Sequence, residues 1–160
     1  MMINEITGEE CREVLARGSI GRLGCSLDNQ PYVVPICFAY EHDYFYVFST
    51  FGQKIEWMRA NPKVCVQVDE IVNQSQWVSV IANGTYEELR EPQYLVESTH
   101  ARQLLERRHR WWLNALAERR ARGNDLLIDP LFFRIHTDSV TGLRALAEGE
   151  GAGAPQRYMY

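Results

Sequence analysis

The chain has 160 residues, of which 46% are hydrophobic and 24% are charged, and its formal net charge is −4 at pH 7. That length fits one domain, which can bury a core without disulfides or metals. The apolar runs are far shorter than the roughly 20 residues of a membrane-spanning helix, and the N-terminus lacks the basic and apolar regions of a signal peptide. We therefore expect a soluble, cytoplasmic protein.

The charge is unevenly distributed along the chain. Residues 101–122 contain seven arginines and two glutamates, a net charge of +5, which leaves −9 for the rest. An acidic body gives no general attraction for phosphate backbones, so this segment suits a partner surface or an intramolecular contact better than nucleic acid. The four cysteines form no CxxC pair and the four histidines have no metal-ligand spacing. We expect neither a disulfide scaffold nor a metal site.

Turn residues and hydrophobic periodicity divide the chain into strands and helices. Thr7 and Glu10 have the spacing of a capping box, which predicts a short helix that ends near Gly18. Helical spacing also predicts a helix over 53–60, with Trp57 and Met58 interpreted as core residues. Apolar and β-branched runs predict six strands, over 19–27, 32–40, 44–50, 64–68, 77–89 and 131–137.

The later part of the chain gives three further expectations. Gly84 interrupts the longest strand, which predicts a bulge or a close approach of another backbone. Residues 92–122 have the spacing of a long helix. Residues 148–160 are rich in glycine and alanine, so we expect a flexible tail after a single domain over 1–147.

The segment from Ser49 to Lys54 has two hydroxyls, a glycine and an ammonium group between a strand and a helix. Lysine is otherwise scarce, because Lys54 and Lys63 accompany fifteen arginines. Such groups at a helix start suit an anion, although a solvated lysine and helix-capping hydroxyls are the plainer alternative. The order of elements suggests a small β-barrel that holds a phosphorylated cofactor at one strand end.

Six strands, with a helix after the third and another before the last, form an order typical of split-barrel flavoproteins. The best-matching segments are IGRLGCS, PYVVPICFAY, FSTFGQK, RANPKVCVQVDE, WVSVIANGTYEEL and VTGLRA. Through these segments the chain resembles the pyridoxamine 5'-phosphate oxidase-like FMN-binding family over about residues 6–145. The branch related to nitroimidazole-resistance proteins is the most similar. The resemblance implies a mainly β fold, a six-stranded antiparallel split β-barrel of Greek-key type, and a homodimer that holds FMN at its interface.

The resemblance also implies roles for particular residues. Ser49 and Thr50 would hydrogen-bond ribityl or phosphate oxygens, and Lys54 would bind the phosphate as a compact charge. Backbone contacts with the isoalloxazine ring and ribityl chain would come from Val33, Val34, Pro35 and Ile36.

Other positions depart from the family pattern or match its interface. Gln53 stands where the oxidases have a phosphate-binding arginine, and Arg22 is our candidate to compensate for it. Gln67, Trp77 and Ser79 match the stretch through which the family's strands reach the cofactor across or beside the dimer interface.

The C-terminal region differs from that of the oxidases. Arg134-Ile135-His136 echoes their Arg-x-His element, but no segment restores their terminal substrate-binding element. We therefore expect an FMN-dependent oxidoreductase that does not oxidise pyridoxamine 5'-phosphate and that uses a reduced nicotinamide or similar donor and a small acceptor. No acid, base or nucleophile constellation stands out, so the sequence names no catalytic residue.

Two other classes of function remain open from the sequence. The first is a non-enzymatic module that holds a flavin or haem for sensing or storage. The second is an arginine-rich interaction protein without a cofactor, in which the ERRHRWW segment would bind anions or single-stranded nucleic acid. The sequence also leaves open whether a deazaflavin replaces FMN.

Overall fold

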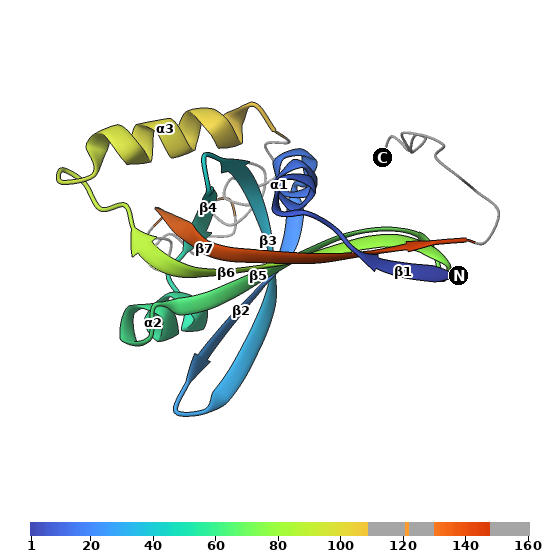
Figure 1. Ribbon diagram of the computed structural model, residues 1–160. Helices are drawn as coiled ribbons and strands as arrows, with labels where there is room; N and C mark the ends of the chain where they lie inside the picture. The colour runs from blue at the N-terminus through green and yellow to red at the C-terminus, as the bar shows by residue number, and fades with distance from the viewer. Residues whose placement is uncertain (109–120, 122–129, 148–160) are drawn as a thin grey trace.

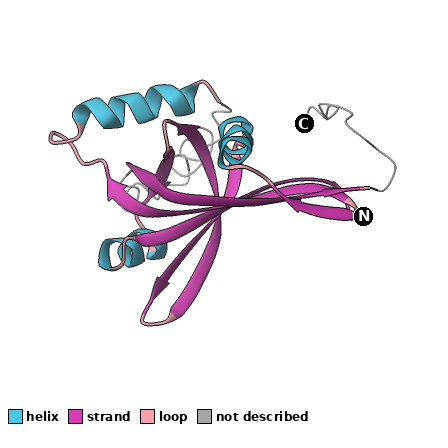
Figure 2. Ribbon diagram, in the orientation of Figure 1, coloured by secondary structure: helices cyan, strands magenta, loops and turns pink. Residues whose placement is uncertain are grey.

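The computed structural model describes residues 1–108, 121 and 130–147 (Figures 1 and 2). None of the helices in these residues has the length and apolar run that crossing a bilayer requires. The elements are β1 (Met2–Glu5), α1 (Gly8–Arg17), β2 (Ile20–Leu27), β3 (Gln30–Glu41), β4 (Tyr44–Thr50), α2 (Gln53–Ala60), β5 (Lys63–Asn73), β6 (Gln76–Glu88), α3 (Leu95–Glu106) and β7 (Pro130–Leu146).

The described strands form a single antiparallel sheet. Its order is β1-β7-β4-β3-β2-β5-β6, and β6 also pairs with β7. This second pairing closes six strands, β2 to β7, into a ring, while β1 is attached to the C-terminal part of β7. The predicted fold class, mainly β with antiparallel strands and a few helices, is confirmed.

Two tight turns fix the register of the first hairpins. Asp28 and Asn29 join β2 to β3, and His42 and Asp43 join β3 to β4; all four residues have φ between 49° and 63°. Asn and Asp tolerate this left-handed region, which two-residue hairpin loops of the I′ type require. The turns therefore set which residues of each strand point into the ring.

Side chains fill the interior of the ring. Phe38, Phe45 and Phe133 are at most 1% exposed, and the rings of Phe38 and Phe45 meet edge to face with centroids 5.1 Å apart. Aliphatic side chains such as Val66 and Val80 complete the core. Because the ring is packed, a ligand has to bind on its outer face or at its strand ends.

The structure corrects the number and the length of the strands. The sequence predicts six, and β1 is a seventh that was missed, because Met2–Glu5 is only four residues long and is exposed throughout. The predicted strand 131–137 is also too short, since β7 continues to Leu146 and pairs with β4, β6 and β1. The predicted helix 92–122 is too long, since α3 begins at Leu95 and ends at Glu106, with Arg107 as its C-cap. The part of the prediction after residue 108 lies outside the described residues, except for residue 121, and so does the predicted tail 148–160.

The bulge predicted at Gly84 is confirmed. The β6–β7 register shifts between Asn83 and Gly84. A Cβ atom on Gly84 would collide with the backbone oxygen of His136, so only glycine allows this approach. Beyond the ring, the β5–β6 hairpin, the end of β7 and β1 extend together in one direction, and the β2–β3 hairpin extends in another (Figure 1).

Tertiary contacts hold the short helix α2 in place. Its N-cap, Gly52, provides no side-chain hydrogen bond. The buried side chains of Ile55 and Met58 anchor it to the core, and the ring of Trp57 lies 5.6 Å from that of Tyr32, centroid to centroid. Met58 is thus a core residue as predicted, and Trp57 packs against the core from a half-buried position.

A half-buried carboxylate, that of Glu88, joins α2 to β6. Arg59 donates to both carboxylate oxygens of Glu88, at 2.8 and 2.7 Å, and Glu88 also accepts from Arg90 at 2.7 Å and from the Tyr86 hydroxyl at 2.8 Å. These bonds, above all those from Arg59, lower the pKa of Glu88 from 4.5 to about 2. The end of α2 is therefore tied to the sheet by a charge-assisted network.

We predict that Glu88→Gln lowers the free energy of unfolding at pH 7 by about 1–3 kcal/mol, because the guanidinium of Arg59 loses its charged acceptor. Because the folded-state pKa is depressed, this stabilisation is complete above pH 4.5 and is lost as the pH falls towards about 2. Urea denaturation of both proteins across that pH range measures it. Glu56→Gln, an exposed change on the same helix, is the control; an equal loss there, or a pH-independent difference, would contradict the prediction.

Candidate functional site

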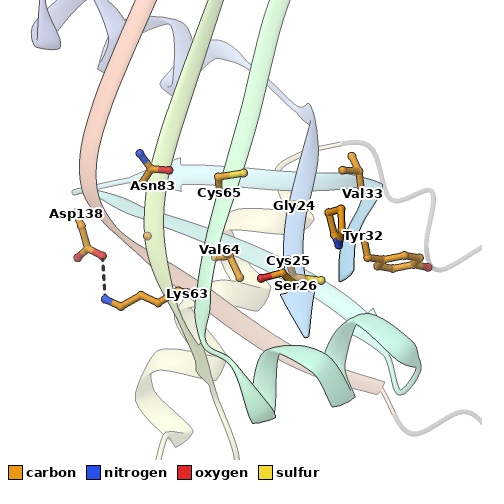
Figure 3. A pocket seen from close by; sticks show the side chains of 12 residues that line it. Gly24, Cys25, Ser26, Tyr32, Val33, Lys63, Val64, Cys65, Asn83 and Asp138 are labelled. Carbon is orange, nitrogen blue, oxygen red and sulfur yellow. Dashed lines mark ion pairs between the residues drawn. The ribbon is translucent and has the colours of Figure 1, made fainter. Parts of the chain in front are cut away.

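A groove of about 530 Å³ crosses the sheet near the end of α2 (Figure 3). It is lined by residues of five strands, β2, β3, β5, β6 and β7. They are Gly24, Cys25, Ser26, Pro31, Tyr32, Val33, Lys63, Val64, Cys65, Asn83, Gly84 and Asp138.

The groove exists because β2 separates from β5. β2 pairs with β3 over its whole length, but with β5 only from Arg22 to Gly24. Beyond Gly24 the β2–β3 hairpin leaves the sheet, and α2 packs beside it through a hydrogen bond from Asn61 Nδ2 to the Ser26 backbone oxygen at 3.0 Å. A Cβ on Gly24 would lie 2.8 Å from Cys65 Sγ, so a side chain there would push into the groove wall.

Lys54, in the first turn of α2, is a half-buried cation. Burial lowers its pKa from the ordinary 10.5, and the nearby Cys25 acts in the opposite direction. No carboxylate among the described residues pairs with it. Together with the first turn of α2, which has no side-chain cap, Lys54 offers positive charge to an external anion.

The other residues predicted at this turn are placed differently. Ser49 is only 6% exposed, and its hydroxyl donates to the Thr50 backbone oxygen at 3.0 Å. Thr50 is half-buried, and Gln53 is exposed at the start of α2. Ser49 and Thr50 thus end β4, and Gln53 and Lys54 begin α2, but the hydroxyl of Ser49 already has a local partner.

The predicted β3 segment presents a backbone edge. Val33 is 65% exposed and lines the groove and Pro35 is exposed, whereas Val34 is half-buried and Ile36 points into the core. β3 pairs with β4 only from Phe38 onward. Within the described residues, the stretch 32–36 therefore has a strand partner on one side only, and we call its other side the open edge of β3.

A third group of predicted residues forms a polar network on the outer face. Gln67 donates to Ser79 Oγ and to Asp69, both at 3.0 Å, and Arg22 lies 3.1 Å from Asp69 in an ion pair. Arg22 thus has side-chain partners on β5. Trp77 is half-buried further along β6, opposite Ile71.

Apolar side chains surround this network on the outer face of the sheet. Four of them, from β2, β5, β6 and β7, are between 43% and 68% exposed, namely Ile20, Ile71, Ile81 and Leu143. Exposed apolar side chains that gather on one face are typical of a surface that meets another protein.

Sequence reasoning missed most of the groove. Of the twelve predicted site residues, Val33 alone lines it. Strand alternation indicates that Cys65 and Asn83 point outward, away from the core. No sequence signal shows that β2 leaves β5 after Gly24. The groove depends on that register.

Comparisons with known proteins bear on this site. The sequence pattern of the family described as pyridoxamine 5'-phosphate oxidase matches residues 7–144. An uncharacterised protein of Rhizobium meliloti (strain 1021) is 40% identical over 151 residues, which cover 94% of this chain and 99% of that protein.

Solved structures are similar as well. The crystal structure of a FAD-binding protein from Mesorhizobium loti has a TM-score of 0.74 and 39% identity, and covers 91% of this chain and 99% of its own. A candidate 5-nitroimidazole antibiotic resistance protein from Bacteroides thetaiotaomicron has a TM-score of 0.64 and 19% identity, with coverage of 90% and 89%. The latter likeness concerns the fold.

We predict that Lys54→Met stabilises the cofactor-free protein by about 0.5–1 kcal/mol, because it removes a half-buried charge that no carboxylate of the described residues pairs with. Since the folded-state pKa of Lys54 is lowered, its cost is present at neutral pH and declines as the pH rises towards 10.5. Urea denaturation at pH 7 measures the change. A loss of more than about 1 kcal/mol would instead show that Lys54 supports the fold.

Proposed function

This chain belongs to the pyridoxamine 5'-phosphate oxidase family, and on that premise we propose that it binds FMN and acts as a flavin-dependent oxidoreductase on small molecules. The Mesorhizobium loti protein, 39% identical, is described as FAD-binding. FAD contains the ring, the ribityl chain and the first phosphate of FMN, so residues that hold these parts would serve both flavins.

The observation that carries the proposal is the half-buried Lys54. Lys54 has no carboxylate partner among the described residues, and a half-buried charge without one is costly, so a phosphate at the start of α2 would supply an anion. Gln53 offers no charge, so Lys54 would be the main phosphate ligand. Arg22 would have to leave its ion pair with Asp69 to assist, so we assign it a secondary role.

The open edge of β3 fits the remainder of the cofactor. Backbone N–H and C=O groups in the stretch 32–36 could pair with polar atoms of the ring and the ribityl chain, and Thr50 is close in sequence to the phosphate ligands. FMN, when bound, supplies the redox chemistry. The protein would orient it and exclude water from it.

The Arg-x-His element has other contacts in this protein. Arg134 lies against Glu87 in an ion pair and over the ring of Tyr44, with its guanidinium 4.5 Å from the ring centroid, and it is only 16% exposed. His136 lies 3.3 Å from Asp138. Because both side chains already have partners within the protein, these contacts support a substrate other than pyridoxamine 5'-phosphate.

We also propose a homodimer through the outer face of β2, β5, β6 and β7. The exposed apolar residues there would be covered by the same face of a second copy, as in the isologous interfaces of most symmetric dimers. Gln67, Trp77 and Ser79 would then lie at or beside the interface. The flavin site next to this face would be enclosed by it.

The proposal predicts that purified protein binds FMN, and that Lys54→Met weakens FMN binding at least tenfold while riboflavin, which lacks the phosphate, binds both proteins equally. Titration followed by flavin fluorescence measures both affinities, and mass analysis of the heat-released cofactor separates FMN from FAD. Arg17→Gln, which removes a surface cation paired with Glu70, is the control.

Equal FMN affinity in the wild type and Lys54→Met would refute the assignment of the phosphate site. Colourless protein that ignores both flavins would refute the proposed function. If the flavin-loaded protein keeps the absorbance of its oxidised flavin at about 450 nm after NADH or NADPH is added, it is a binding module rather than a reductase.

The dimer predicts that Ile81→Arg, which places a charge on the apolar face, yields a monomer in analytical ultracentrifugation, whereas the wild type sediments as a dimer. Ile81 is 45% exposed in the single chain, so the change should not disturb the fold. Val96→Arg, on the exposed side of α3, is the matched control. A wild-type monomer, or an undisturbed Ile81→Arg dimer, would contradict the proposed interface.

A further inference from the structure

The groove has two unlike ends. Tyr32 and Val33 form an apolar wall on β3, whereas Lys63, Asn83 and Asp138 form a polar group on β5, β6 and β7 (Figure 3). β2, β5 and β6 lie between β3 and β7 on this side of the ring, so the two ends of the groove belong to strands that are not neighbours. A ligand held at the β3 wall would leave room at the polar end.

The carboxylate of Asp138 is held ready to accept hydrogen bonds. Thr85 Oγ1 donates to one oxygen at 3.0 Å, and His136 Nδ1 lies 3.3 Å from the other. The Thr85 bond is the main cause of the lowered pKa of Asp138, so the group is ionised at neutral pH. A carboxylate has about four lone-pair sites, so further acceptor capacity remains on the groove side.

The two neighbours of Asp138 complement it. Lys63 Nζ lies 3.9 Å from Asp138 and 3.3 Å from Thr85 Oγ1, and as a 74% exposed ammonium it can still approach an anion. Asn83 donates one N–H to Ser139 Oγ at 3.4 Å, so its carbonyl oxygen and its second N–H can bond a ligand. The ammonium also disfavours a metal ion here.

We propose that the Lys63, Asn83 and Asp138 end of the groove binds an adenosine nucleotide with an unphosphorylated ribose. A carboxylate accepts hydrogen bonds from ribose hydroxyls, an ammonium binds phosphate, and an amide can pair with the edge of adenine. The inference rests on the proposed flavin function. The nucleotide belongs either to the second half of FAD or to a reduced nicotinamide dinucleotide, which share this chemistry.

The test is calorimetric titration of the full chain with 5'-AMP. We expect binding by the wild type, at least tenfold weaker binding by Asp138→Asn and by Lys63→Gln, and weaker binding of 2'-AMP, whose phosphate would face the carboxylate. Glu70→Gln, which breaks a comparable surface ion pair away from the groove, should bind like the wild type. Both substituted residues are exposed, and thermal melting verifies that the variants fold.

The source of the nucleotide is read from the same variants. If Asp138→Asn weakens FAD but not FMN, the site holds the adenylate of FAD; if it weakens NADH alone, it holds the donor. No binding of 5'-AMP, or equal binding by the wild type and both variants, overturns the inference. If 5'-AMP does not bind but FMN still binds in a Lys54-dependent way, the proposed function stands. If the wild type binds 5'-AMP but neither flavin, the proposed function is refuted and the nucleotide site stands.

Discussion

The packed interior of the six-stranded ring is the constraint on which the remaining features depend. Aromatic and branched side chains fill it, led by Phe38, Phe45 and Phe133, so the protein can offer a ligand only its outer face and its strand ends. Both candidate binding regions lie there. The open edge of β3 and the start of α2 form one, and the groove where β2 leaves β5 forms the other.

Stability and binding are linked through α2. The helix has only eight residues and no side-chain N-cap, so its position depends on Ile55, Met58 and the network around Glu88. Those contacts hold in place an element that carries the half-buried cation of Lys54 at its opposite end, where no carboxylate of the described part of the chain pairs with it. The ion pair of Arg59 thus offsets the cost of burying the charge of Lys54, as is common where a site is completed by its ligand.

Local signals account for the parts of the fold that the sequence predicts. β4 and α2 have the predicted bounds, because strand periodicity, helix spacing and the Asn61-Pro62 stop all act within a few residues. β1 has no such signal, since it is a strand only through its pairing with β7. The segment from Ser49 to Lys54 runs from the end of β4 to the start of α2, where the same local signals place it. The groove was beyond sequence reasoning, because it depends on the place where the pairing of two strands ends.

The distribution of cations indicates where an anionic ligand can be recognised. Among the described residues, arginines 12, 17, 22, 59, 90, 134 and 144 are all paired with carboxylates, so their charge is largely neutralised within the protein. The two lysines differ. Lys54 has no carboxylate partner there, and Lys63 has a loose one at 3.9 Å. Arginine suits fixed bidentate pairs, whereas lysine is a flexible point charge that can move to a phosphate. Among the described cations of α2 and strands β2 to β7, Lys54 and Lys63 are therefore the least neutralised by carboxylates, one at the start of α2 and one at the polar end of the groove.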